Sequence, residues 1–166
     1  GTGKGRGYPP PPVLMETITY NFRNAEAILA QIPAWSELLR AIDSVERDDV
    51  LTAQKMRRDS SSRTPTGAQT VVNQIMHERL IDAGWDDEVK LFDTTNPDSD
   101  RAKWAMDFRK SRIGVEVSFN HAEAIAWTLV RLNIAGESTE VEQEAAIDVG
   151  VAIFPTKSFK SWGRMD

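Results

Sequence analysis

The chain has 166 residues, of which 40% are hydrophobic, and its formal net charge is −5 at pH 7. A chain of this length can bury one sizeable core and is too short for two, so we expect one domain. It contains no cysteine, which excludes disulfides, thiolate metal sites and cysteine nucleophiles. No apolar run reaches the roughly 20 residues that span a bilayer, so we expect a soluble, cytoplasmic protein with no membrane partner. The negative net charge argues against a surface that is basic throughout, but not against a local basic cleft.

The first 12 residues contain four glycines and four consecutive prolines and show no apolar periodicity. We expect a flexible or extended arm at 1–12 and a single domain at 13–166. Apolar residues then recur at steps of three and four between positions 20 and 45, which predicts a helix with a break near Pro33. The side chains expected in the core are those of Ala27, Ile28, Ile32, Trp35, Leu38, Leu39 and Ile42.

Residues 51–69 contain the most basic stretch of the chain, with four cations between positions 55 and 63 and a single acid at Asp59. A run of serines followed by Pro65 and Gly67 predicts a loop. A basic loop ahead of a helix can hold phosphates through its side chains and through helix-terminal amides. The same composition is also typical of a solvated linker. Residues 66–83 have the apolar spacing of an amphipathic helix that ends at Gly84.

From residue 86 the apolar period changes, and turn-forming residues separate short alternating runs. This pattern predicts a strand, a loop, a strand, a tight turn and a strand between 86 and 119. Alternation places Trp104, Met106 and Phe108 on one face of the second strand and Asp107 on the other. In the third strand it separates the apolar residues from Glu116. We therefore expect the carboxylates of Asp107 and Glu116 to face the same side of a hairpin.

The last two predicted elements are a helix and a strand. Residues 122–136 read as a helix with broad burial that includes Trp127, Leu129 and Val130, and residues 145–156 read as a nearly continuous apolar strand. Such a strand is typical of a sheet covered on both faces. The order of elements predicts an α/β or α+β fold, with a central mixed β-sheet flanked by helices.

Two carboxylates on neighbouring strands, with a backbone carbonyl beside them, form a cluster of hard oxygen ligands that suits Mg²⁺. A bound Mg²⁺ lowers the pKa of a water molecule, orients it against a phosphorus atom and neutralises charge on the phosphate oxygens. Phosphodiester hydrolysis is the reaction that most needs this arrangement. The alternative is a solvent-facing edge hairpin without a chemical role.

Residues 106–108, MDF, and residues 115–121, VEVSFNH, resemble the catalytic hairpin of the PD-(D/E)xK nucleases, in particular the BglII/BstYI/BamHI-type restriction endonucleases. Residues 67–92 are similar to the preceding helix of that family, and residues 149–157 to its next core strand. The resemblance implies a restriction-endonuclease-like core and a prokaryotic, cytoplasmic type II restriction endonuclease. Such an enzyme would cut double-stranded DNA with Mg²⁺ at a short palindromic site, and the relatives suggest a GATC-containing one. The family core continues beyond the position of Asp166, so we expect a C-terminally incomplete domain.

The resemblance also implies roles for individual residues. Asp107 would be the central metal ligand, Glu116 the second carboxylate ligand, and the carbonyl of Val117 a further ligand. Ser118 falls where the general pattern has lysine and the BglII relatives have glutamine or glutamate. Its hydroxyl can hydrogen-bond the attacking water but is no base at neutral pH. Glu88 matches an upstream acidic position, as a third ligand or as a group behind the ligands.

In this family the residues after the second catalytic strand enter the major groove, so we expect Asn120 and His121 to read base edges. An asparagine can pair with adenine through two hydrogen bonds, and Asn120 also suits the N-cap of the helix that follows. The other expected DNA contacts come from the two basic segments, namely Lys55, Arg57, Arg58, Ser60, Ser61, Arg63, Lys157 and Lys160.

Cleavage of both strands of a palindrome requires two-fold symmetry, so the resemblance implies a homodimer, with the helix at 66–83 as an interface element. Two other functions remain open from the sequence. A DNA-binding module that keeps the nuclease fold without catalysis is supported by Ser118. A repair nuclease that recognises DNA structure is the other.

Overall fold

The computed structural model describes residues 17–60, 67–92, 104–119, 122–157 and 159. The four strands of this part form one mixed sheet in the order β1-β2-β3-β4. The first three strands pair antiparallel, and β4 runs parallel to β3. This confirms the predicted fold class. The elements, in chain order, are α1 (Ala25–Leu29), α2 (Pro33–Asp43), α3 (Arg47–Ser60), α4 (Ala68–Asp82), β1 (Asp86–Lys90), β2 (Ala105–Lys110), β3 (Ile113–Val117), α5 (Ala122–Glu137) and β4 (Val149–Ile153).

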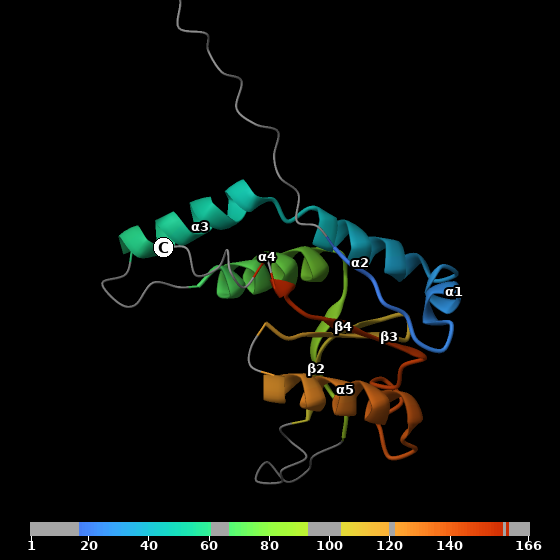
Figure 1. Cartoon of the computed structure of the whole chain (residues 1–166). Helices are drawn as coiled ribbons and strands as arrows, with labels where there is room; N and C mark the ends of the chain where they lie inside the picture. The colour runs from blue at the N-terminus through green and yellow to red at the C-terminus, as the bar shows by residue number, and fades with distance from the viewer. Residues whose placement is uncertain (1–16, 61–66, 93–103, 120–121, 158, 160–166) are drawn as a thin grey trace, which may run out of the picture.

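Helices cover both faces of the sheet (Figure 1). Helix α5 lies on one face, whereas α1, α2 and α4 lie on the other, with α3 outside α4. On the α2 and α4 side the core includes Leu38, Leu80 and Val115. On the α5 side it includes Leu132 and Ile147. The prediction of a central sheet shielded on both faces is therefore confirmed. None of the described helices is both long and apolar enough to cross a membrane.

The predicted break at Pro33 separates α1 from α2. Pro33 is the first residue of α2, a position at which its missing N–H would have no helical partner anyway. Helix α2 buries Leu38 fully, as expected. The prediction that Ala27 and Ile28 are core residues is wrong, since both are exposed. Helix α1 has only five residues and buries only Leu29, so it has no room for a wider apolar face.

Most of the segment predicted as a basic loop is helical. Helix α3 continues to Ser60, because residues 53–58 are mostly good helix formers and the turn-forming Pro65 and Gly67 come only afterwards. Its first turn is anchored by Val50, which is fully buried against α4. The basic residues of this segment up to Arg58 therefore lie on a helix.

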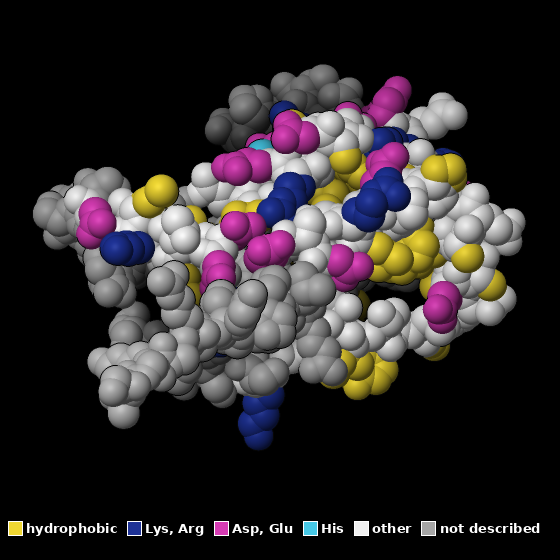
Figure 2. Space-filling model, turned by 90° about the horizontal axis from the view of Figure 1, so that it is seen from above, with side chains coloured by type: hydrophobic (Ala, Val, Ile, Leu, Met, Phe, Trp, Pro, Cys, Tyr) yellow, Lys and Arg dark blue, Asp and Glu magenta, His cyan; other side chains and the backbone are white. Residues whose placement is uncertain are grey.

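The outer face of the helical layer carries charges of both signs. Figure 2, which looks down on this face, shows Asp and Glu interspersed with Lys and Arg, with apolar side chains between them. The described side chains of this face therefore form no continuous basic surface.

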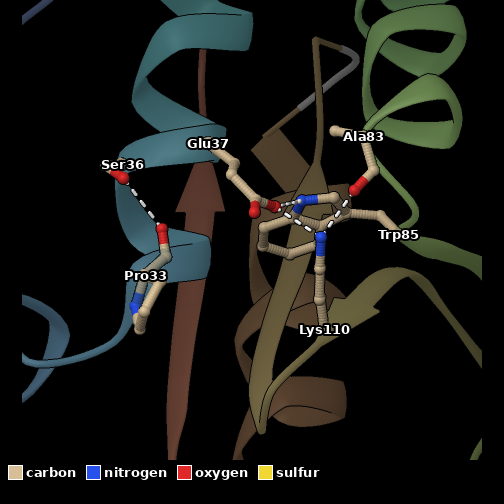
Figure 3. Close-up of polar contacts among 6 residues, drawn as sticks. All are labelled: Pro33, Ser36, Glu37, Ala83, Trp85 and Lys110. Carbon is tan, nitrogen blue, oxygen red and sulfur yellow. Dashed lines mark hydrogen bonds and ion pairs between the residues drawn. The ribbon is translucent and has the colours of Figure 1, made fainter.

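A polar network ties the helices to the turn end of the β2–β3 hairpin (Figure 3). The ammonium group of Lys110 donates to Glu37 Oε2 over 2.6 Å and to the carbonyl of Ala83 over 2.5 Å. Trp85 Nε1 donates to the same carboxylate oxygen over 3.2 Å. The hydrogen bond from Lys110 lowers the pKa of Glu37 below its usual value. The network joins α2, the α4–β1 turn and the last residue of β2, and so fixes one end of the hairpin.

The tight turn between β2 and β3 consists of Ser111 and Arg112, both with positive φ, 48° and 64°. A two-residue hairpin turn of type I′ requires positive φ at both of its central residues. Arg112 donates to Asp148 Oδ1 over 2.8 and 2.6 Å, and its carbonyl accepts the N–H of Asp148. These bonds hold the turn against the start of β4 and confirm the predicted strand, turn and strand.

Candidate active site

The backbone ladder of the hairpin stops at Asp107. The β2–β3 register runs from Lys110 opposite Ile113 to Phe108 opposite Val115, and its continuation places Asp107 opposite Glu116. At this position the carboxylate of Asp107 replaces a backbone acceptor, because its Oδ2 accepts a hydrogen bond from the backbone N–H of Val117 over 2.7 Å. Residues directly opposite in an antiparallel pair point to the same face. Continued by one step, this register would turn the two acids to the same side, and their common orientation stays a prediction.

The ladder between β1 and β2 also omits Asp107. Its partner by register would be Glu88, which has a left-handed φ of 46°. Across this irregularity, Phe108 packs on the α2 and α4 side, whereas Met106 packs on the α5 side. The prediction that Met106 and Phe108 share a face is therefore wrong, because regular alternation does not continue through Asp107.

Glu116 is buried and carries a matched cation. Its side chain is 1% exposed, and both of its oxygens accept hydrogen bonds from Arg131 of α5, over 2.7 Å from Nε and 2.5 Å from Nη2. The same guanidinium lies near enough to Asp107 for each charge to affect the pKa of the other group. Asp107, Glu116 and Arg131 thus form one charged cluster between the hairpin and α5.

Burial sets the electrostatics of this cluster. It raises the pKa of Asp107 above its usual value, although the Val117 N–H and Arg131 act against the rise, and the charge of Glu88 adds to it. Burial likewise raises the pKa of Glu116, against the hydrogen bonds from Arg131 and with the charge of Asp107 adding to it. Two desolvated carboxylates and one guanidinium leave a site that favours further positive charge.

The structure brings together some of the predicted ligands. Asp107 and Glu116 approach one another closely enough for the charge of Asp107 to raise the pKa of Glu116, and Val117 adjoins both. Glu88 is exposed on β1. Among the residues that the structure describes, no three His, Cys, Asp or Glu side chains are grouped closely enough to hold a metal ion. The ligand roles of these residues therefore stay predictions.

Ser118 follows β3 directly and is buried, with 8% of its surface exposed. Its backbone N–H donates to the carbonyl of Ile153 over 2.9 Å and so extends the β3–β4 pairing by one step. Two residues after Glu116, it continues the alternation on the face of the carboxylates. Its role beside the metal ligands stays a prediction.

The end of β3 lies beside two other segments predicted to bind DNA. Phe119 packs in one cluster with Val71 and Val72, from the first half of α4. Its ring centroid is 5.4 Å from that of Phe159, which places the segment around the exposed Lys157 at this same end of the molecule. Lys55 is exposed on α3, the helix that packs outside α4.

Several predicted DNA contacts cannot be placed. Outside the described residues, or with side chains that are not described, lie Asn120, His121, Arg57, Arg58, Ser60, Ser61, Arg63 and Lys160. Their roles remain predictions from the resemblance.

Arg131 is a residue of the site that the sequence pattern did not predict. Helix α5 was expected to bury Trp127, Leu129 and Val130, but these side chains are 57%, 53% and 41% exposed. Thr128, 1% exposed, and Arg131 face the sheet instead. Arg131 supplies the cation that the buried carboxylate of Glu116 needs. The signal was present in the sequence: Arg131 is the only charged residue between 124 and 136.

Comparison with protein-family models matches residues 17–166 to the family described as restriction endonuclease BglII/BglIII. No curated protein and no solved structure matches the chain. The family match covers the whole described part of the chain, including the hairpin on which the resemblance was based. The chain therefore belongs to the BglII/BglIII family of restriction endonucleases and is a type II site-specific deoxyribonuclease.

Proposed function

We propose that this enzyme makes Mg²⁺-dependent double-strand cuts at a short palindromic DNA site, with the ion held by Asp107, Glu116 and the carbonyl of Val117. The observation that carries the proposal is the interrupted ladder. At this one step of the hairpin two carboxylates, each with its pKa raised by burial, lie near one another, and a side chain replaces a backbone partner. A purely structural hairpin would gain nothing from one buried and one partly buried acid, since each costs free energy to desolvate.

The donor set suits a hard cation. Mg²⁺ prefers carboxylate and carbonyl oxygens, and these three residues supply them. No described residue donates a hydrogen bond to Oδ1 of Asp107, whereas both oxygens of Glu116 bind Arg131. A Mg²⁺ ion at this position would neutralise charge on the phosphate oxygens and lower the pKa of a water molecule.

The residues of the chain then have defined tasks. The N–H of Val117 fixes the carboxylate of Asp107, so that one of its oxygens keeps a constant direction. The hydroxyl of Ser118 hydrogen-bonds the attacking water and orients it, but at neutral pH it accepts no proton from it. That proton passes to solvent or to a substrate phosphate oxygen. Glu88 supplies a third negative charge beside Asp107.

DNA recognition belongs to the end of β3. Asn120 and His121, which follow Phe119, would read base edges in the major groove. Lys157 and the basic residues of α3 would contact phosphates, which gives binding that weakens with salt. A homodimer with α4 as an interface element would place two such sites on the two strands of a palindrome. The resemblance to the BglII-type enzymes suggests a GATC-containing site.

Digestion of a sequenced plasmid with Mg²⁺, followed by mapping of the ends, tests the proposal. We expect discrete fragments with identical ends at every copy of one palindrome. Asp107→Ala should abolish cleavage and leave DNA binding measurable by gel shift. Asp43→Ala, which removes an exposed carboxylate at the end of α2, should cut normally. Nicking or a smear would indicate a structure-specific nuclease, and intact plasmid a binding module. Cleavage by Asp107→Ala would rule out the site.

A further inference from the structure

We propose that Arg131 neutralises the active site in the metal-free enzyme: it binds the carboxylate of Glu116 and is displaced from it when a divalent ion binds. The affinity of the site for metal is then set by competition with this guanidinium. This inference rests on the proposed function, because it takes Glu116 to be a metal ligand.

The pair is unlike the other ion pairs of the described structure. Glu116 is 1% exposed and both of its oxygens are taken by the fork of Arg131. The pair between Arg112 and Asp148, by comparison, is about half exposed on both sides, at 48% and 52%. Exposed pairs exchange readily with water and contribute little. A carboxylate that is fully desolvated has to keep a cation, so any ion that binds Glu116 must replace Arg131 or share its oxygens.

Sharing is limited by geometry. A bidentate guanidinium occupies both carboxylate oxygens in one plane, and a second cation on the same oxygens would lie close to a fixed positive charge. Exchange is the simpler outcome. Arg131 can also reach water, since 27% of its side chain is exposed.

Helix α5 offers the displaced guanidinium a second partner. Thr128 lies three residues before Arg131, hence on the same helix face, and helical side chains lean towards the N-terminus. Its side chain is 1% exposed, and its hydroxyl is the one buried side-chain oxygen or nitrogen without a hydrogen-bond partner among the described residues. A buried hydroxyl without a partner is costly, and a guanidinium N–H released from Glu116 would satisfy it.

Titration of the full chain with Mn²⁺ in the absence of DNA, followed by calorimetry, measures the competition. Arg131→Gln should tighten Mn²⁺ binding by at least about tenfold, the lower end for a desolvated charge pair. Arg131→Lys, which keeps the charge but loses the two-point contact, should lie between Arg131→Gln and wild type. The matched control is Arg112→Gln, which removes the same charge from a half-exposed pair and should change the affinity by less than about twofold.

NMR of the wild-type protein provides a second measurement. The Nε–Hε group of Arg131 donates to Glu116 over 2.7 Å, so its NMR signal should be protected from exchange in EDTA. The signal is assigned by its absence in Arg131→Lys. At saturating Mg²⁺ it should shift or broaden as the group leaves Glu116. A signal that stays unchanged at saturation would overturn the proposal.

The outcomes separate this inference from the proposed function. If Asp107→Ala loses Mn²⁺ binding while Arg131→Gln binds no more tightly than wild type, the metal site stands and the exchange is refuted. If Asp107→Ala binds Mn²⁺ as well as wild type, the metal site itself is wrong. Tighter binding by Arg131→Gln, with Arg112→Gln unchanged and Asp107→Ala inactive in binding, supports both.

Discussion

The ion pair between Glu116 and Arg131 should respond very unequally to loss of either partner. Arg131→Gln leaves a carboxylate that is 1% exposed without its cation, which should lower the free energy of unfolding by about 3–5 kcal/mol. Glu116→Gln leaves a guanidinium that is 27% exposed and can turn to water. Its cost should be about 1–2 kcal/mol, the loss of charge-assisted hydrogen bonds. The double variant should cost about as much as Glu116→Gln alone, because Arg131 then has no buried charge to compensate.

Urea unfolding at pH 7.5 with EDTA, followed by tryptophan fluorescence, gives these free energies. Equal slopes of free energy against urea concentration would show that the variants unfold from equally compact states. The explanation would be refuted if Glu116→Gln cost as much as Arg131→Gln, or if the two costs simply added in the double variant. Either result would mean that burial of Glu116 does not govern the pair.

Three further variants test other parts of the structure. Burial raises the pKa of Asp107 above 3.8, so its contribution to stability is present below pH 3.8 and is lost as pH rises through the folded pKa. In EDTA at pH 7, Asp107→Asn should therefore unfold at a higher urea concentration than wild type. This gain in stability should disappear towards pH 3.8. The hydrogen bond from Lys110 lowers the pKa of Glu37 below 4.5. Glu37→Gln should therefore lower the free energy of unfolding by about 1 kcal/mol at pH 7, and by less as pH falls through the folded pKa. A loss that does not depend on pH would contradict the charged contact between Lys110 and Glu37. A Cβ at Gly114 would lie 2.3 Å from Met106 Sδ, so Gly114→Ala should lower the free energy of unfolding by about 1–3 kcal/mol. The control Gly67→Ala should change it little, because a Cβ there would meet nothing within 4 Å.

The sequence was sufficient for the features that depend on local pattern. Pro33 predicted the break between α1 and α2, and the alternation around the two-residue turn predicted the β2–β3 hairpin. The same alternation also gave the prediction that Asp107 and Glu116 share a face, which stays a prediction because both strand ladders omit Asp107. The prediction of a basic loop was wrong because the good helix formers at 53–58 continue α3 up to the serines, ahead of Pro65.

Features that depend on tertiary contacts could not be predicted in this way. Helix α5 has apolar residues around most of its circumference, so its periodicity did not show which face is buried. The buried face includes Thr128 and Leu132, and Arg131 reaches Glu116, a residue on another element. The change of side at Met106 coincides with the gap at Asp107 in the β1–β2 ladder, which no pattern within β2 could reveal.

A crystal of the metal-free enzyme soaked with Mn²⁺ tests the central claim most directly, because anomalous scattering locates the ion independently of the protein atoms. We predict one ion bonded to carboxylate oxygens of both Asp107 and Glu116, with Arg131 turned away from Glu116. An ion absent from this position, or bound to Asp107 while both oxygens of Glu116 remain on Arg131, would contradict it.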